Sequence, residues 1–86
     1  MNKQLAELRE RMDKIDEEII ALLRKRKDLV LEAIDLKKKN SLEFKDKSRE
    51  AALFNHVKEL ARKHDLDEKY VSELFERILQ HSHELV

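Results

Sequence analysis

Apolar residues recur along the first half of the chain at alternating steps of three and four positions. They are Leu5, Leu8, Met12, Ile15, Ile19, Leu22, Leu29, Ala33 and Leu36. This heptad spacing places all of them on one side of a helix and predicts a single long helix from about residue 3 to about residue 39. We call this row of positions the heptad seam. Its one polar member, between Leu22 and Leu29, is Arg26.

Two shorter helical patterns follow, each after a break. Residues 40–45 interrupt the heptad pattern and predict a loop, after which Asp46 is a candidate N-cap. The helix that it begins should run to about residue 63, with its apolar face formed by Leu53, Phe54, Val57, Leu60 and Ala61.

The third helix is expected after residues 64–67. Asp65 and Glu68 have the spacing of a capping box, although Asp67 could cap the helix instead. The sequence therefore predicts an all-α chain of three helices forming one domain over residues 1–86. The apolar side of this third helix should carry Val71, Leu74, Phe75, Ile78, Leu79, Leu85 and Val86.

Composition supports this fold class. The 86 residues contain no glycine and no proline, 44% are charged and 41% are hydrophobic, as in helical bundles and coiled coils. Without glycine we expect no hairpins, no turns with positive φ, no glycine-rich phosphate loop and no nucleophile elbow. The absence of cysteine excludes disulfides and thiol chemistry, and a formal net charge of zero gives no overall attraction to nucleic acid or membranes.

The chain shows no sign of export or membrane insertion. The first ten residues, MNKQLAELRE, lack the apolar segment of a signal peptide. The longest run without a charged residue, Ala51 to Val57, is too short to span a bilayer. We therefore expect a cytoplasmic protein.

Helix lengths favour a homodimer. At the standard rise, the first helix should be about 50 Å long and the other two about 25 and 30 Å. A second helix folded back on the first would cover only about half of the heptad seam. The stripe from Leu5 to Leu22 then needs another partner, and a second copy of the chain is the simplest one.

Arg26 and Lys37 are the first candidate site residues. They lie eleven positions apart, which puts them on the same face of the first helix and about 16 Å apart along its axis. Both could belong to a solvated basic tract. Alternatively, because a cation in an apolar seam is costly unless it is paired, the two could hold a small dianion between them.

Other polar residues allow both a structural and a functional interpretation. Ser82 is the polar member of the third helix's stripe and could be a spacer bonded to its own helix. Asp46 could be only a cap, and Arg49 with Glu50 only a surface pair. The four histidines predict no convergent metal site, since His81 and His83 should point to different sides of their helix.

Taken together, these elements resemble the all-helical chorismate mutase family. The family opens with a pattern like LxxLRxxIDxIDxxIxxLLxxR, and residues 5–26 read LAELRERMDKIDEEIIALLRKR. Lys37 follows at the family's spacing, then a D-x-x-R-E element from Asp46 to Glu50, then Ile78 and Ser82 of an I-x-x-x-S pattern. The resemblance covers Leu5 to Val86 and requires no gap.

The resemblance implies an intertwined homodimer of three-helix chains with shared active sites and no cofactor or metal. Each site would rearrange chorismate to prephenate, on the route to phenylalanine and tyrosine. Arg26 and Arg9 of the partner subunit would bind the two carboxylates, supported by Arg49. Lys37 would stabilise the charge that develops on the ether oxygen, and Glu50 would accept a hydrogen bond from the substrate hydroxyl near Asp46 and Ser82.

One position departs from the family pattern. Four residues after Ser82 the family usually has glutamine, a second donor to the ether oxygen, and this chain has Val86. Gln80 lies on another side of the helix and cannot replace it. A mutase of reduced rate is the leading interpretation. A mutase-like domain with a related substrate or a regulatory role and a non-catalytic dimeric bundle are the alternatives.

Overall fold

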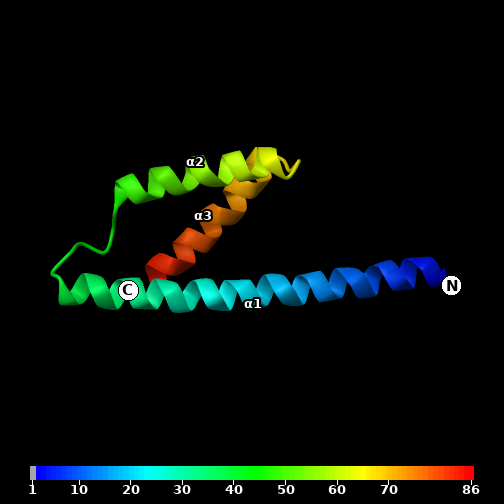
Figure 1. Ribbon diagram of the computed structural model, residues 1–86, viewed down its shortest axis with the longest axis horizontal. Helices are drawn as coiled ribbons and strands as arrows, with labels where there is room; N and C mark the ends of the chain where they lie inside the picture. The colour runs from blue at the N-terminus through cyan, green and yellow to red at the C-terminus, as the bar shows by residue number, and fades with distance from the viewer. Residues whose placement is uncertain (1) are drawn as a thin grey trace. The chain divides into compact units, whose positions relative to one another are not determined.

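The computed structural model describes residues 2–86 and contains, within them, three helices and no strand. They are α1 (Lys3–Lys39), α2 (Lys47–Lys63) and α3 (Glu68–Glu84), in the order that Figure 1 shows. This confirms the all-α class and both ends of α1. The chain divides into two compact units, one up to Glu32 and one from Ala33 to Val86, with the boundary inside α1.

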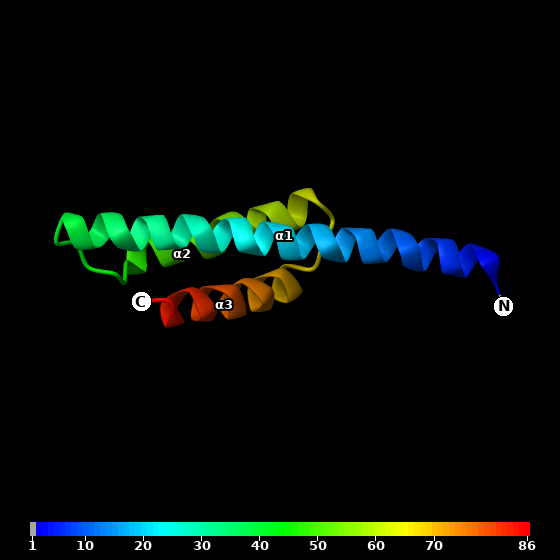
Figure 2. The same cartoon turned by 90° about the horizontal axis from the view of Figure 1, so that it is seen from below.

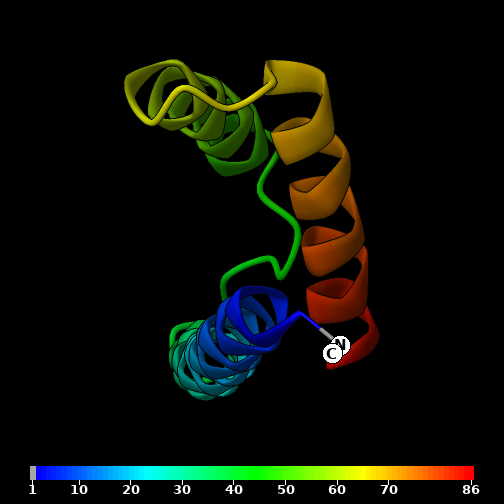
Figure 3. The same ribbon diagram turned by 90° about the vertical axis from the view of Figure 1, so that its right-hand side faces the viewer.

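The core of the second unit lies between α2 and α3. After a short connection, α3 turns back at an oblique angle to α2 (Figures 1 and 2). Figure 3 shows the start of α3 beside the end of α2. The buried residues of this α2–α3 cluster are Leu53, Val57, Ala61 and Val71, and the partly buried Phe54, Phe75 and Leu79 pack against them.

Besides Val86, two residues of the predicted apolar faces are exposed in the chain. Leu60 is 37% exposed and Leu74 is 46% exposed, whereas Val57 and Ala61 are each 2% exposed. A single neighbouring helix covers only the centre of an apolar face, so residues at its margin stay in contact with solvent.

Aspartate side chains cap the two shorter helices. Asp46 Oδ1 accepts a hydrogen bond from the backbone N–H of Arg49 at 3.1 Å, which confirms the predicted N-cap of α2. At α3 the cap is Asp67, whose Oδ2 accepts from the backbone N–H of Tyr70 at 3.0 Å. The capping-box alternative at Asp65 is therefore wrong.

The ends of α1 and α2 both contain a residue with positive φ. Ser41 has φ 55° and Asp65 has φ 56°, so the expectation that such turns would be absent without glycine is wrong. In the first of these turns, the N–H of Leu42 donates to the carbonyl of Lys37 at 2.8 Å and that of Ser41 to Lys38 at 3.3 Å. This is a Schellman motif, which satisfies helix-end carbonyls and offsets the cost of the left-handed residue.

The second turn repeats the motif. The N–H of Leu66 donates to the carbonyl of Ala61 at 2.8 Å, and that of Asp65 to Arg62 at 3.3 Å. Asp65 is thus the left-handed residue that follows α2, which explains why it does not cap α3.

The heptad seam is exposed in the single chain over most of its length. Leu5, Leu8, Met12, Ile15, Ile19 and Leu22 are between 42% and 61% exposed, and Leu29 and Leu36 are exposed as well. An apolar surface of this extent is typical of an interaction site. No helix in residues 2–86 is long and apolar enough to cross a membrane.

The third helix ends earlier than its apolar pattern predicts. Glu84 is its last residue, Leu85 is the C-cap, and Val86 follows with 60% exposure. Val86 therefore lies outside α3, although its N–H still donates to the carbonyl of His83 at 3.4 Å.

Candidate active site

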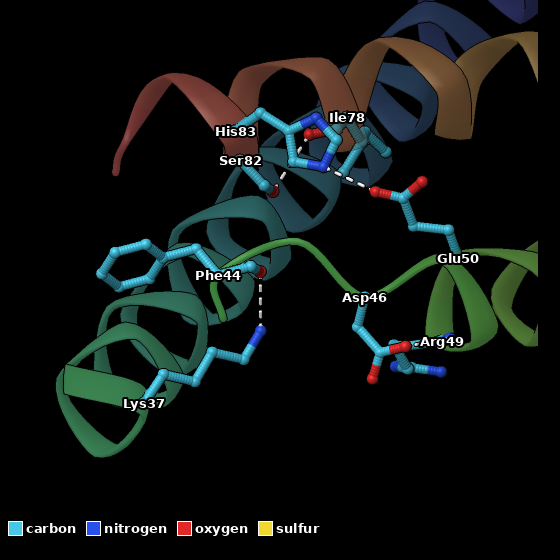
Figure 4. Close-up of polar contacts among 8 residues, drawn as sticks. All are labelled: Lys37, Phe44, Asp46, Arg49, Glu50, Ile78, Ser82 and His83. Carbon is cyan, nitrogen blue, oxygen red and sulfur yellow. Dashed lines mark hydrogen bonds and ion pairs between the residues drawn. The ribbon is translucent and has the colours of Figure 1, made fainter. Parts of the chain in front are cut away.

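Lys37 stands at the last turn of α1 and reaches across to the following loop. Its Nζ donates a hydrogen bond to the carbonyl oxygen of Phe44 at 2.9 Å, as Figure 4 shows. The Schellman turn at Ser41 reverses the chain direction just after α1, which brings the loop back beside this lysine. An ammonium has three donors, so two remain for another acceptor.

A solvent-open hollow adjoins this lysine within the second unit. Its volume is about 610 Å³. Its lining includes both lysines and acids, so it presents fixed charges of both signs. It is lined by Lys37, Leu42, Glu43, Lys45, Asp46, Lys47 and Ser48.

The first turn of α2 holds the D-x-x-R-E element. Asp46 is exposed and acts as the cap, and Arg49 is exposed one turn into the helix. Glu50 is partly buried in the same turn. A carboxylate at this place is favoured by the partial positive charge of the helix N-terminus.

Glu50 is joined to α3 rather than to Arg49 beside it. Its Oε1 lies 2.9 Å from Nε2 of His83, and Figure 4 shows the two side chains pointing toward one another. Oε1 is fully buried and accepts no hydrogen bond of good geometry. The ring N–H is therefore not aligned with the oxygen, and the two atoms are in close contact without hydrogen-bond geometry.

Ser82 precedes this histidine on α3. Its Oγ donates to the carbonyl oxygen of Ile78 at 3.1 Å, one turn earlier on the same helix. This agrees with the interpretation of Ser82 as a spacer bonded to its own helix. The side chain is partly buried.

Arg9 and the seam residue Arg26 belong to the unit that ends at Glu32. Arg26 is partly buried and Arg9 is exposed. In the surrounding basic tract, Arg24 forms an exposed ion pair with Asp28 at 3.1 Å, as expected of a solvated face. Of the predicted site residues, the second unit contains Lys37, Asp46, Arg49, Glu50, Ser82 and Val86.

His83 is the residue at this site that the sequence did not predict. It is separated from Glu50 by more than thirty positions. No periodicity or motif relates two such residues, so only the packing of α3 on α2 reveals their contact. Among residues 2–86, no three histidine or acidic side chains group closely enough to hold a metal ion.

Comparison with known proteins gives a family match over almost the whole chain. The model of the family described as "Chorismate mutase type II" matches residues 8–85. The chain belongs to this family. The match covers the elements that carry Arg9, Arg26, Lys37, Glu50 and Ser82.

Curated relatives of this family are similar over most of the chain. A chorismate mutase of Methanocaldococcus jannaschii is 27% identical over 82 residues, which are 95% of this chain and 83% of that protein. The bifunctional chorismate mutase/prephenate dehydratase of Buchnera aphidicola subsp. Schizaphis graminum is 36% identical over 91% of this chain. The Escherichia coli strain K12 protein of the same name is 33% identical over 91%. The chain spans 20% of each of these two bifunctional proteins.

Proposed function

We propose that this chain is a chorismate mutase that converts chorismate to prephenate. The observation that carries the proposal is the family match over residues 8–85, which includes the predicted cationic and acidic site positions. The reaction is an intramolecular Claisen rearrangement: one ether C–O bond breaks as one C–C bond forms, and no group is transferred to the protein. The enzyme's task is therefore to bind, orient and stabilise charge.

Arginines bind the two substrate carboxylates in this proposal. Arg26 and Arg9 of the partner subunit each offer a planar guanidinium that can meet a carboxylate with two hydrogen bonds. Arg49, in the first turn of α2, supports the same anionic region. Arg26 thus occupies a seam position because the bundle interior has to hold an anion there.

Lys37 stabilises the transition state. Negative charge grows on the ether oxygen as the C–O bond breaks, and an ammonium beside it binds the transition state more tightly than the ground state. The hydrogen bond from Nζ to Phe44 supports this role, because it holds the ammonium while two donors stay available.

The start of α2 and the end of α3 orient the substrate. Glu50 accepts a hydrogen bond from the substrate hydroxyl, and Asp46 and Ser82 stand beside it in the site. Val86 occupies the position of a second donor to the ether oxygen in the family pattern. A valine cannot donate, so we propose a rate below that of a mutase with glutamine there.

The active form in this proposal is a homodimer in which residues 1–86 act as one domain. The exposed heptad seam from Leu5 to Leu22 supports this, because a second copy can cover it. Two intertwined copies would also bring Arg9 of the partner subunit to each site. We propose that the protein acts in the cytoplasm, without a cofactor or metal.

The direct test is a turnover assay. Chorismate is mixed with the purified protein, and the loss of its ultraviolet absorbance is followed over time. We expect enzyme-dependent loss, with prephenate as the product. No loss above the uncatalysed rate at any protein concentration would overturn the proposed function. It would leave the regulatory or non-catalytic alternatives.

A further inference from the structure

The contact between Glu50 and His83 joins the first turn of α2 to the last turn of α3. Nε2 of His83 lies 2.9 Å from Oε1 of Glu50, and the two side chains are 43% and 24% exposed. Oε1 itself is fully buried and has no hydrogen-bond partner within the described residues. The imidazole of His83 is therefore the polar group that lies beside this buried oxygen.

We propose that His83 is a positioning residue that holds the carboxylate of Glu50 by Oε1 and leaves its other oxygen for the substrate hydroxyl. This inference rests on the proposed mutase function and deepens it. A small rotation of the ring aligns Nε2–H with Oε1, and the contact then becomes a hydrogen bond to a charged acceptor.

The physical need for such a residue comes from the glutamate side chain. It has three rotatable bonds, and fixing them for each binding event costs conformational entropy. A partner on a different helix removes that cost in advance, because the carboxylate is held before the substrate arrives.

A neighbouring histidine provides a matched control. His81 is on the same helix, is 56% exposed, and has Nδ1 3.6 Å from Oε2 of Glu84, an acid of its own helix. It resembles His83 in type, exposure and acidic neighbour, but its partner is not a proposed site residue. His81→Leu should therefore reproduce any general effect of losing a histidine from α3.

The experiment measures kcat and KM for chorismate in the full-length wild type and in His83→Leu, His83→Gln and His81→Leu. The substrate hydroxyl belongs to neither the C–O bond that breaks nor the C–C bond that forms. Losing the positioned carboxylate should therefore weaken substrate binding more than it lowers kcat. We expect His83→Leu to raise KM about tenfold with a smaller change in kcat. His83→Gln keeps a donor and should restore most of the affinity, and His81→Leu should resemble wild type.

A double-mutant cycle with Glu50→Gln tests whether His83 acts through the carboxylate. In that background His83→Leu should add little to KM. If it still raises KM tenfold, His83 acts by another route and the positioning role is overturned. The role is equally overturned if His83→Leu has wild-type KM, or if it lowers only kcat and the melting temperature as a structural residue would.

The measurements distinguish failure of the proposed mutase function from failure of the positioning role of His83. A wild-type protein that neither converts chorismate nor binds prephenate would overturn the mutase assignment, and the substrate role of His83 with it. An active wild type with unaffected His83 variants would overturn the positioning role alone.

Discussion

The ammonium of Lys37, at the end of α1, is hydrogen-bonded to the main-chain carbonyl of Phe44 in the loop that follows, at 2.9 Å. The acceptor is a backbone atom, so its place depends on the path of the loop and not on which side chain occupies position 44. That path is set by the Schellman turn, in which Leu42 N–H bonds back to the carbonyl of Lys37 itself. The same residue is thus held through both its main chain and its side chain.

We expect Lys37→Ala to lower kcat by about a hundredfold or more, since in the proposed mechanism it removes a preorganised donor to the ether oxygen. Stability should change little, because one exposed hydrogen bond contributes about 0.5–1.5 kcal/mol. Lys38→Ala, at the next and exposed position, is the control and should keep wild-type kcat. Steady-state kinetics and thermal melts measure both quantities. Equal kcat in the two variants would exclude Lys37 from catalysis.

Arg26→Ala should abolish measurable turnover while the protein keeps its helical content. Alanine has the highest helix propensity, so the loss should come from the missing carboxylate contact rather than from unfolding. Arg24→Ala is the matched control, because Arg24 is a 74% exposed partner of Asp28. Circular dichroism and the absorbance assay report the two effects. Unfolding of the Arg26 variant would make that arginine a structural residue instead.

The protein should sediment as a dimer at micromolar concentration, and Ile15→Lys should shift it toward monomer with reduced helicity. Ile15 is 55% exposed in the single chain and lies at the middle of the uncovered part of the heptad seam. A charge there has to be buried when a second copy binds. Glu17→Lys, on the opposite side of α1, should remain dimeric. A compact wild-type monomer in sedimentation equilibrium would contradict this assembly.

Val86→Gln should raise kcat more than it lowers KM. The new amide would donate to the ether oxygen, whose charge is larger in the transition state than in the bound substrate. The gain should be about tenfold to a hundredfold if the glutamine is held. Because α3 ends at Glu84, a short polar extension that adds a helical turn should increase the gain. An ordered glutamine in a substrate-analogue complex with unchanged kcat would show that this protein makes no use of such a donor.

Local patterns in the sequence determined the helices. The heptad spacing predicted α1 with both its ends, and Asp46 was recognisable as a cap because a cap and the N–H groups that it binds lie within one turn. The family could also be recognised from the sequence, because its signature is a set of residue types at fixed separations. The site residues Arg9, Arg26, Lys37, Asp46, Arg49, Glu50, Ser82 and Val86 remain predictions from that resemblance.

Tertiary structure alone decided which groups meet. From its position in the sequence alone, Glu50 could equally have paired with Arg49. Its contact with His83 exists only because α3 packs back on α2. The hydrogen bond from Lys37 to a loop carbonyl and the positive φ of Ser41 and Asp65 depend on how the chain reverses after each helix. Helical periodicity relates residues a few positions apart, whereas these features depend on chain reversals and on packing between helices, which no single periodic pattern contains.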